Sequence, residues 1–385
     1  MTRNRIIYAI LWVLSLIGIS FFGGPVSYGF FTLLTLIPIV SFIYLLFVFF
    51  SFRIYQELEN KNLTAGHTTP FTFILKNEFP FGFSGIRVKF FSDFSEITGL
   101  NDNAEYELQP KTGIKKQTKI HCRYRGEYEV GIKSMELQDY LRLIRLKFNN
   151  KETLRVTVKP NIVELPALKS LHSSVIMTKE SAFQKSQADV LSRPYVTGDD
   201  VRYANWKVSA KNGDLFVRQM TGEERDGIGI ILPLKRYSAQ ANEYLPTENK
   251  MLETAIALSY FFLKKNTPVQ VSLGCDRKLD KRATKKERFQ DVYEFVSTAE
   301  FREDLDDKAQ FTGVLSGNEI YRNRMVFLVV SRFDAGVRET VIKLHDNHIP
   351  VVIYRIGPSD EALDIKLSNV EMISMDPEAD IKEVL

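Results

Sequence analysis

The sequence has little cysteine, little histidine and almost no excess charge. Its 385 residues include two cysteines, five histidines and no HExxH pattern. Cys122 and Cys275 are too far apart for a CxxC motif and too few for a disulfide framework, which indicates a reducing compartment. The formal net charge of +4 gives no support to nucleic-acid binding. A charged fraction of 25% and 28 Phe exclude a disordered chain.

Charge is also absent from one long segment, since no charged residue lies between Arg5 and Arg53. A helix needs about 20 apolar residues to cross a bilayer. Residues 6–22 and 30–50 supply two apolar runs, and the Gly-Gly-Pro at 23–25 breaks the helix between them. Residues 1–53 are therefore predicted to form a two-helix transmembrane hairpin. A secretory signal peptide is the competing interpretation, but the second run follows at once with no polar start of a mature chain.

The basic residues that flank the hairpin predict its orientation. Arg3 and Arg5 precede the first run, Arg53 and Lys61 follow the second, and the connecting turn is uncharged. Basic flanks stay on the cytoplasmic side. We therefore expect a multi-pass protein of the cell membrane, with the lipid bilayer as a partner and both termini in the cytoplasm.

Residues 54–160 change to short alternating runs rich in Phe, Tyr, Val and Ile, separated by turn residues. Strands are predicted at 69–77, 85–91, 104–109, 116–124, 126–137 and 152–160. This spacing is typical of an antiparallel immunoglobulin-like β-sandwich. His121 and Cys122 are adjacent in a strand and point to opposite faces, so no metal site is expected there. The domain is interpreted as a spacer or an interaction module.

After a linker and signature segment at 161–225, residues 226–385 alternate between strands and helices. Strands are predicted at 227–234, 267–274, 324–331 and 349–357, and helices at 247–265, 286–301 and 335–348. The strands are almost continuously apolar, which predicts a parallel sheet covered on both faces, a doubly wound α/β domain. Its ligand edge would lie at the carboxyl ends of the strands.

That edge carries no nucleotide-binding motif, because neither GxGxxG nor GxxxxGK[ST] follows a strand. The residues that do follow the first and third strands include Lys235, Arg236, Ser331, Arg332 and Asp334. His345 and His348 form an HxxH pair without the further ligands that zinc requires. No cofactor and no metal are expected.

The densest stretch is residues 191–220, "LSRPYVTGDDVRYANWKVSAKNGDLFVRQM". Asp199 and Asp200 follow Gly198 at a turn or helix start. Cations surround them in the sequence at Arg193, Arg202, Lys207, Lys211 and Arg218. Tyr195 and Trp206 add large apolar faces with one polar group each. These residue types fit a buried ion-pair core, a partner-binding surface or a carboxylate metal site.

This stretch resembles the signature of the bacterial family known as domain of unknown function 58. The matching residues are Arg193, Tyr195, Gly198, Asp199, Asp200, Arg202, Trp206, Ser209 and Ala210. Residues 124–143 also resemble the family's strand before an Asp-containing turn. The resemblance implies a membrane hairpin, a β domain and a C-terminal domain of von Willebrand factor A type. It also implies a MoxR-type AAA+ ATPase as a partner.

Many von Willebrand factor A domains hold a metal through Asp-x-Ser-x-Ser after the first strand. The matching place here reads "LPLKRYS", with Leu232 or Leu234 where the Asp would be. Lys235 and Arg236 would oppose a divalent cation. The departure predicts that this domain does not bind a metal.

The expected function is that of a non-enzymatic, membrane-anchored adaptor or scaffold in protein-complex assembly or envelope maintenance. We expect Trp206 to be mainly structural, with Asp199, Asp200 and Arg202 forming the functional face. Two alternatives stay open, a hydrolase that uses Asp199 and Asp200 and a purely structural envelope component.

Overall fold

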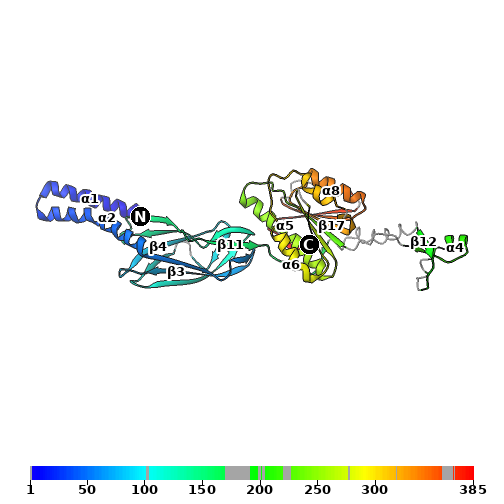
Figure 1. Ribbon diagram of the computed structural model, residues 1–385. Coiled ribbons are helices and arrows are strands. Elements are labelled where there is room, and N and C mark those ends of the chain that lie inside the picture. The colour runs from blue at the N-terminus through cyan, green and yellow to red at the C-terminus, as the bar shows by residue number, and fades with distance from the viewer. Residues whose placement is uncertain are drawn as a thin grey trace. The chain divides into compact units, whose positions relative to one another are not determined.

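The computed structural model describes residues 2–100, 104–169, 191–197, 201, 204–219, 227–275, 278–317, 319–357, 367 and 369–385. The chain divides into two compact units, Met1–Lys159 and Pro160–Leu385 (Figure 1). The predicted membrane segment and β domain, described from the sequence as separate segments, thus lie in one unit.

The first unit begins with two long apolar helices, α1 (Thr2–Phe22) and α2 (Pro25–Ser51), drawn in blue in Figure 1. Gly23 and Gly24 join them with φ angles of 55° and 105°, values that glycine adopts without steric cost. Trp12 Nε1 donates to Thr35 Oγ1 at 3.1 Å, which holds the helices side by side. By length and composition, both helices are capable of crossing a membrane.

The β domain follows α2 directly, and the described residues between 52 and 159 form eleven strands. They are β1 (Phe52–Leu58), β2 (Asn62–Thr64), β3 (Thr68–Asn77), β4 (Phe83–Phe90), β5 (Ser95–Thr98), β6 (Glu105–Leu108), β7 (Gly113–Cys122), β8 (Gly126–Val130), β9 (Ile132–Gln138), β10 (Arg145–Asn149) and β11 (Leu154–Lys159). Two antiparallel sheets have the orders β1-β3-β7-β5 and β10-β9-β4-β6. Phe71 and Phe73 of the first sheet share one buried core with Ile86 and Met135 of the second.

A third sheet, β2-β11-β8, departs from the all-antiparallel expectation, because β11 pairs with β2 in parallel. The sequence prediction also placed no strand at β1, β2, β5 or β10. Short edge strands such as β5 and β10 bury few side chains, so their sequences carry a weak apolar pattern.

The second unit contains a six-stranded sheet with the order β16-β15-β14-β17-β18-β19. Its strands are β14 (Gly227–Pro233), β15 (Val269–Gly274), β16 (Lys278–Ala283), β17 (Asn323–Val330), β18 (Val351–Ile356) and β19 (Val370–Met375). All neighbours are parallel except β16, which runs antiparallel to β15 at the edge. The predicted α/β region is therefore confirmed, while β16 and β19 were not predicted.

Helices cover both faces of this sheet. They are α5 (Ala241–Lys264), α6 (Phe289–Ser297), α7 (Ala309–Leu315), α8 (Ala335–Asp346) and α9 (Ile381–Val384), with 3₁₀ turns η3 (Lys286–Arg288) and η4 (Ile320–Arg322). Adjacent residues of β14 point to opposite faces. Ile230 joins the core that contains α5 and α6, and Ile231 joins the core that contains α7 and α8.

Candidate functional site

The signature forms a small strand–helix–strand piece. β12 (Leu191–Pro194) pairs antiparallel with β13 (Phe216–Gln219), and α4 (Trp206–Asn212) lies between them in sequence. Arg193 lies in β12 opposite Val217. All three residues of the predicted functional face, Asp199, Asp200 and Arg202, lie outside the described residues, as does Gly198.

Hydrogen bonds fix α4 to β13. Asn205 caps the helix by accepting from the backbone N–H of Val208 at 3.4 Å. Ser209 Oγ donates to the Asn205 carbonyl at 2.9 Å and accepts from the Phe216 N–H at 2.8 Å. Gly213, with φ of 78°, ends the helix in the left-handed conformation. Ser209 of the signature therefore has a positioning role between helix and strand.

Trp206 occupies the first turn of α4 with 66% of its surface exposed. Lys207 and Ala210 are exposed on the same helix. So exposed a ring contributes little to a core, which argues against the expectation that Trp206 is mainly structural. The signature instead presents its tryptophan on a short helix whose own hydrogen bonds do not depend on the indole. Tyr195 is half-buried, and its N–H donates to the Leu215 carbonyl at 2.8 Å.

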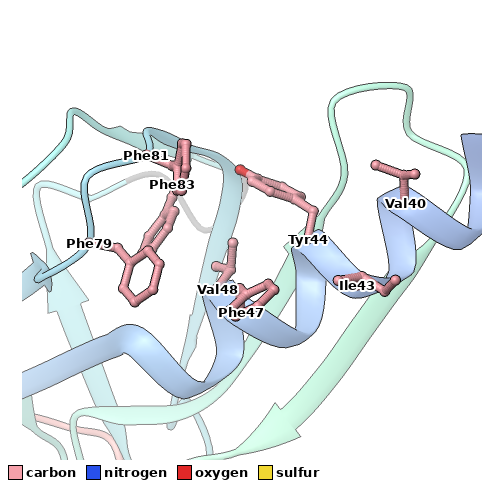
Figure 2. A pocket seen from close by; sticks show the side chains of 8 residues that line it. All are labelled: Val40, Ile43, Tyr44, Phe47, Val48, Phe79, Phe81 and Phe83. Atoms are coloured by element: carbon pink, nitrogen blue, oxygen red, sulfur yellow. The ribbon is translucent and has the colours of Figure 1, made fainter.

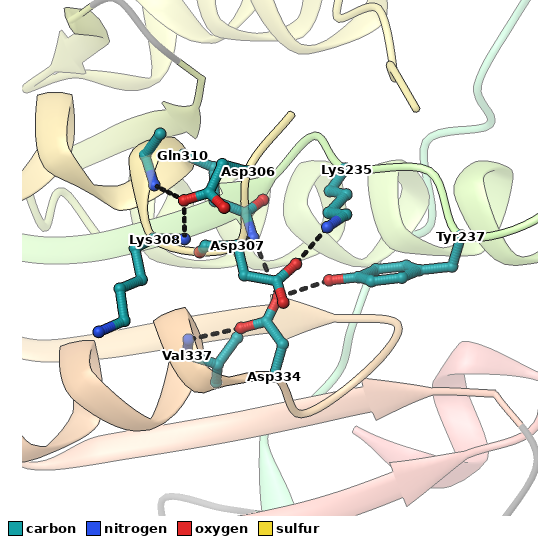
Figure 3. A network of polar contacts seen from close by, with 9 residues as sticks. Lys235, Tyr237, Asp306, Asp307, Lys308, Gln310, Asp334 and Val337 are labelled. Atoms are coloured by element: carbon teal, nitrogen blue, oxygen red, sulfur yellow. Dashed lines mark hydrogen bonds and ion pairs between the residues drawn. The ribbon is translucent and has the colours of Figure 1, made fainter. Parts of the chain in front are cut away.

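A second cluster lies at the carboxyl ends of β14 and β17, the adjacent strands where the chain order reverses. Ligands bind at this position in doubly wound sheets. Figure 3 shows its polar contacts. Lys235, after β14, forms an ion pair with Asp307 from the loop before α7. Tyr237 Oη donates to Asp334 Oδ2, after β17, at 2.5 Å.

Asp334 connects three segments of this edge. Its Oδ1 caps α8 by accepting from the Val337 N–H at 2.7 Å. Its Oδ2 accepts from Gln310 Nε2 at 3.1 Å, and the same amide donates to the Asp307 carbonyl at 3.2 Å. One carboxylate thus ties the β14–α5 loop, α7 and the start of α8 together, because each of them offers it a donor.

Two side chains of this edge, Tyr237 and Lys235, interact with its carboxylates. Burial raises the pKa of Tyr237, and its hydrogen bond to Asp334 raises it further, so the phenol remains a donor at neutral pH. The ammonium of Lys235 forms an ion pair with the carboxylate of Asp307. The described part of the chain has no group of three or more His, Cys, Asp or Glu suited to a metal.

Beside this network is a pocket of about 330 Å³ whose walls include Arg236, Arg332 and Arg355. The guanidinium of Arg236 is occupied by both oxygens of Glu248, at 2.6 and 3.1 Å. That pairing raises the pKa of Arg236. Arg332 is exposed and lies over the Tyr237 ring at 5.4 Å.

Sequence reasoning placed Lys235, Arg332 and Asp334 at this edge, but it missed Asp307 and Gln310. Both come from outside the strand ends, so strand positions gave no signal for them. The acidic stretch before α7 was the available signal. Asp306 of that stretch caps α7 by accepting from the N–H groups of Lys308 and Ala309.

The remaining histidine and cysteine candidates have structural contacts. His345 Nδ1 contacts Asn369 Oδ1. Cys122 is buried in the β domain, and burial raises the pKa of its thiol, which makes it unreactive.

Comparison with known proteins bears on the signature. No curated protein matches the sequence. Solved structures similar to parts of the chain include the CARDB domain of the PF1109 protein from Pyrococcus furiosus, with 16% identity, a TM-score of 0.20, and coverage of 28% of this chain and 91% of that one. Another is E. coli alpha-2-macroglobulin, with 17% identity, a TM-score of 0.22, and coverage of 29% and 7%. TM-scores this low support no conclusion about the fold, so the architecture described above depends on the strand pairing alone.

The family model described as "Protein of unknown function DUF58" matches residues 191–298. This range begins at β12, includes α4 and β13, and continues through β14, α5 and α6. Over these residues, the resemblance that the signature indicated is confirmed, and the chain is similar to the DUF58 family.

Proposed function

We propose that this protein is a membrane-anchored adaptor that captures a partner protein through the exposed face of α4. The observation that carries the proposal is the 66% exposure of Trp206. Tryptophan is strongly enriched among the residues that dominate binding energy at interfaces. Lys207 and Lys211 are exposed on the same helix, which favours a partner with an acidic surface.

The α/β domain of this adaptor is proposed to be of von Willebrand factor A type, and the β domain to be immunoglobulin-like. The parallel sheet with one antiparallel edge strand supports the first assignment. Its carboxyl edge works without a metal in this proposal, because Lys235 supplies the positive charge next to Asp307. The edge would then be a rigid protein-binding surface rather than a metal-dependent one.

The partner is proposed to be a MoxR-type AAA+ ATPase, which the family resemblance implies. The complex would serve protein-complex assembly or envelope maintenance. The rival hydrolase depends on Asp199 and Asp200, which lie outside the described residues. The contacts of α4 and of the sheet edge favour binding over catalysis.

Trp206→Ala is expected to weaken capture of the ATPase by about 2 kcal/mol or more, close to 30-fold in Kd. The melting temperature should change little, because exposed side chains contribute within about 0.5 kcal/mol to folding. The measurement pairs thermal melts with pull-down of purified ATPase by the detergent-solubilised full chain.

The matched control is Tyr55→Ala, since Tyr55 is another exposed aromatic, 48% accessible, in the β domain. It should leave both readouts unchanged. Undiminished capture by a folded Trp206→Ala variant would exclude α4 as the docking surface. A large loss of stability would instead mean that the indole packs against the rest of the protein.

The proposed anchor places both termini in the cytoplasm, because Arg3, Arg5 and Arg53 flank the spans and the turn at Gly23 and Gly24 is uncharged. Reporter fusions at the turn and at the C-terminus should therefore report opposite sides of the membrane. Reporters found on the same side would contradict the hairpin.

A further inference from the structure

One end of the β domain packs against α2 through aromatic side chains, as Figure 2 shows. A pocket of about 270 Å³ is bounded by residues of α2 and of the turn before β4. Its lining consists of Val40, Ile43, Tyr44, Phe47, Val48, Phe79, Phe81 and Phe83. A second pocket of about 800 Å³ lies between α2 and the turn that follows β9, and Asp139, Tyr140 and Leu141 belong to its lining.

The length of α2 places Tyr44, which lines both pockets, at the level of the membrane boundary. Its 27 residues span about 40 Å, whereas the hydrocarbon core is about 30 Å thick. A span that starts at Pro25 therefore ends near Tyr44. Tyr44 Oη donates to the Gly82 carbonyl at 3.0 Å, and tyrosine is enriched at membrane–water interfaces.

Contacts at the start of α1 indicate the same position of the membrane boundary, independently of the length of α2. Asn4 Nδ2 donates to the Leu141 carbonyl at 3.1 Å, and Arg5 Nε donates to the Leu143 carbonyl at 2.7 Å. Arg5 is the last charged residue before the apolar part of α1. The polar start of α1, Tyr44 of α2 and two turns of the β domain thus lie at one depth.

Large apolar side chains are exposed at this depth. Phe81 is 64% exposed, Tyr140 is 63% exposed and Leu141 is 47% exposed. Tyr140 Oη donates to the Gly82 carbonyl at 2.8 Å, so the two turns hold each other in place. Rigidly held aromatic side chains beside a membrane span fit the boundary between headgroups and acyl chains.

The lining of the larger pocket includes a buried carboxylate, that of Asp139. Asp139 is only 2% exposed, and its Oδ1 accepts from the Ile144 N–H at 2.8 Å. Its Oδ2 is buried and has no hydrogen-bond partner in the described part of the chain. Such an oxygen favours a ligand that offers a hydrogen-bond donor, and an ammonium group offers a charged one.

We propose that these pockets seat phospholipid, with acyl chains against α2 and an amine headgroup, as in phosphatidylethanolamine, donating to Asp139. Phe81, Tyr140 and Leu141 enter the lipid boundary and fix the β domain to the bilayer surface. This inference rests on the proposed membrane anchor and goes beyond it. The anchor requires only that α1 and α2 cross the bilayer.

The test uses the full chain in lipid nanodiscs, with a fluorescent nitrobenzoxadiazole label at single cysteines. Phe81→Cys is the test position, Ile10→Cys in α1 is the positive control and Thr68→Cys at the far end of β3 is the negative control. The native thiols are removed by Cys122→Ala and Cys275→Ser. Thr68 is nine residue steps along β3 from Asn77 at the bilayer end, a distance of about 30 Å.

Lipids carrying spin labels in the acyl chains should quench the label at positions 10 and 81 and leave position 68 bright. Quenching at position 10 alone would overturn the lipid contact and keep the anchor. Bright emission at all three positions would contradict both, because the anchor itself would then be outside the bilayer.

The headgroup assignment has its own readout, the lipid that stays bound to the detergent-solubilised full chain in native mass spectrometry. With equimolar phosphatidylethanolamine and phosphatidylcholine, the wild type should retain the ethanolamine lipid preferentially. Asp139→Asn should lose that preference, because it keeps the acceptor for Ile144 while removing the charge. Equal retention of both lipids by the wild type would overturn the role of Asp139.

Discussion

Gly336→Ala is expected to destabilise the α/β domain by about 3 kcal/mol. A Cβ at Gly336 would lie 1.8 Å from the backbone oxygen of Asp307 and 2.9 Å from Cδ2 of Phe311. The Phe311 ring is buried and the Asp307 carbonyl accepts from Gln310 Nε2, so moving either aside costs packing or a hydrogen bond. The substitution would therefore push α8 away from the loop before α7 and disturb the ion pair between Asp307 and Lys235. Thermal melts of the full chain should show a fall of about 10 °C.

The matched control is Gly82→Ala in the β domain. An added Cβ there meets its nearest neighbour, the Leu108 carbonyl oxygen, at 3.5 Å, which is ordinary van der Waals contact. That variant should melt within a few degrees of the wild type. If Gly336→Ala melts at the same temperature as well, α8 does not pack as closely on Asp307 as the structure has it.

Asp334→Ala is expected to cost a similar amount, roughly 3 kcal/mol. Removing the carboxylate deletes the cap of α8, worth about 1 kcal/mol. It also leaves Tyr237 and Gln310 without the charged acceptor they share, at about 1.5–3 kcal/mol for hydrogen bonds of this kind. Chemical denaturation with fluorescence detection would measure the loss directly.

Asp334→Asn separates the cap from the charge. Asparagine caps helices about as well as aspartate, so the bond to Val337 should survive. The hydrogen bond from Tyr237 should weaken, because a neutral acceptor is poorer than a carboxylate. We therefore expect Asp334→Asn to lower the free energy of unfolding by less than Asp334→Ala does. Equal costs for the two variants would show that the charge, and not the cap, dominates at this position.

The sequence predicted those parts of the fold that have a strong apolar pattern. The hairpin follows from an uninterrupted apolar segment, and β14, β15, β17 and β18 follow from continuous apolar runs. Strand β16 was missed because "KLDKRA" has the charged composition of a protected edge strand. Strand β1 was missed because its alternation begins directly after a helix, with no turn residue to mark the change.

The candidate site was predictable only where strand topology places residues. Parallel strands bring their carboxyl ends together, which identified Lys235 and Asp334. Asp307 reaches the same edge through a loop whose path no periodicity predicts. The exposure of Trp206 was also beyond the sequence, because a tryptophan at helical spacing fits a core and a surface equally well.

The absence of any linker between Ser51 and Phe52 has a consequence for how this chain tolerates insertions and deletions. Each residue of a helix advances its face by about 100°. One residue added within the last turn of α2 would turn the whole apolar hairpin by that angle relative to the strands, whose own pairing would stay in register. The rotation of the hairpin relative to the β domain thus depends on the number of residues in α2. A length change here alters which helix face the β domain meets, even though every existing side chain is kept.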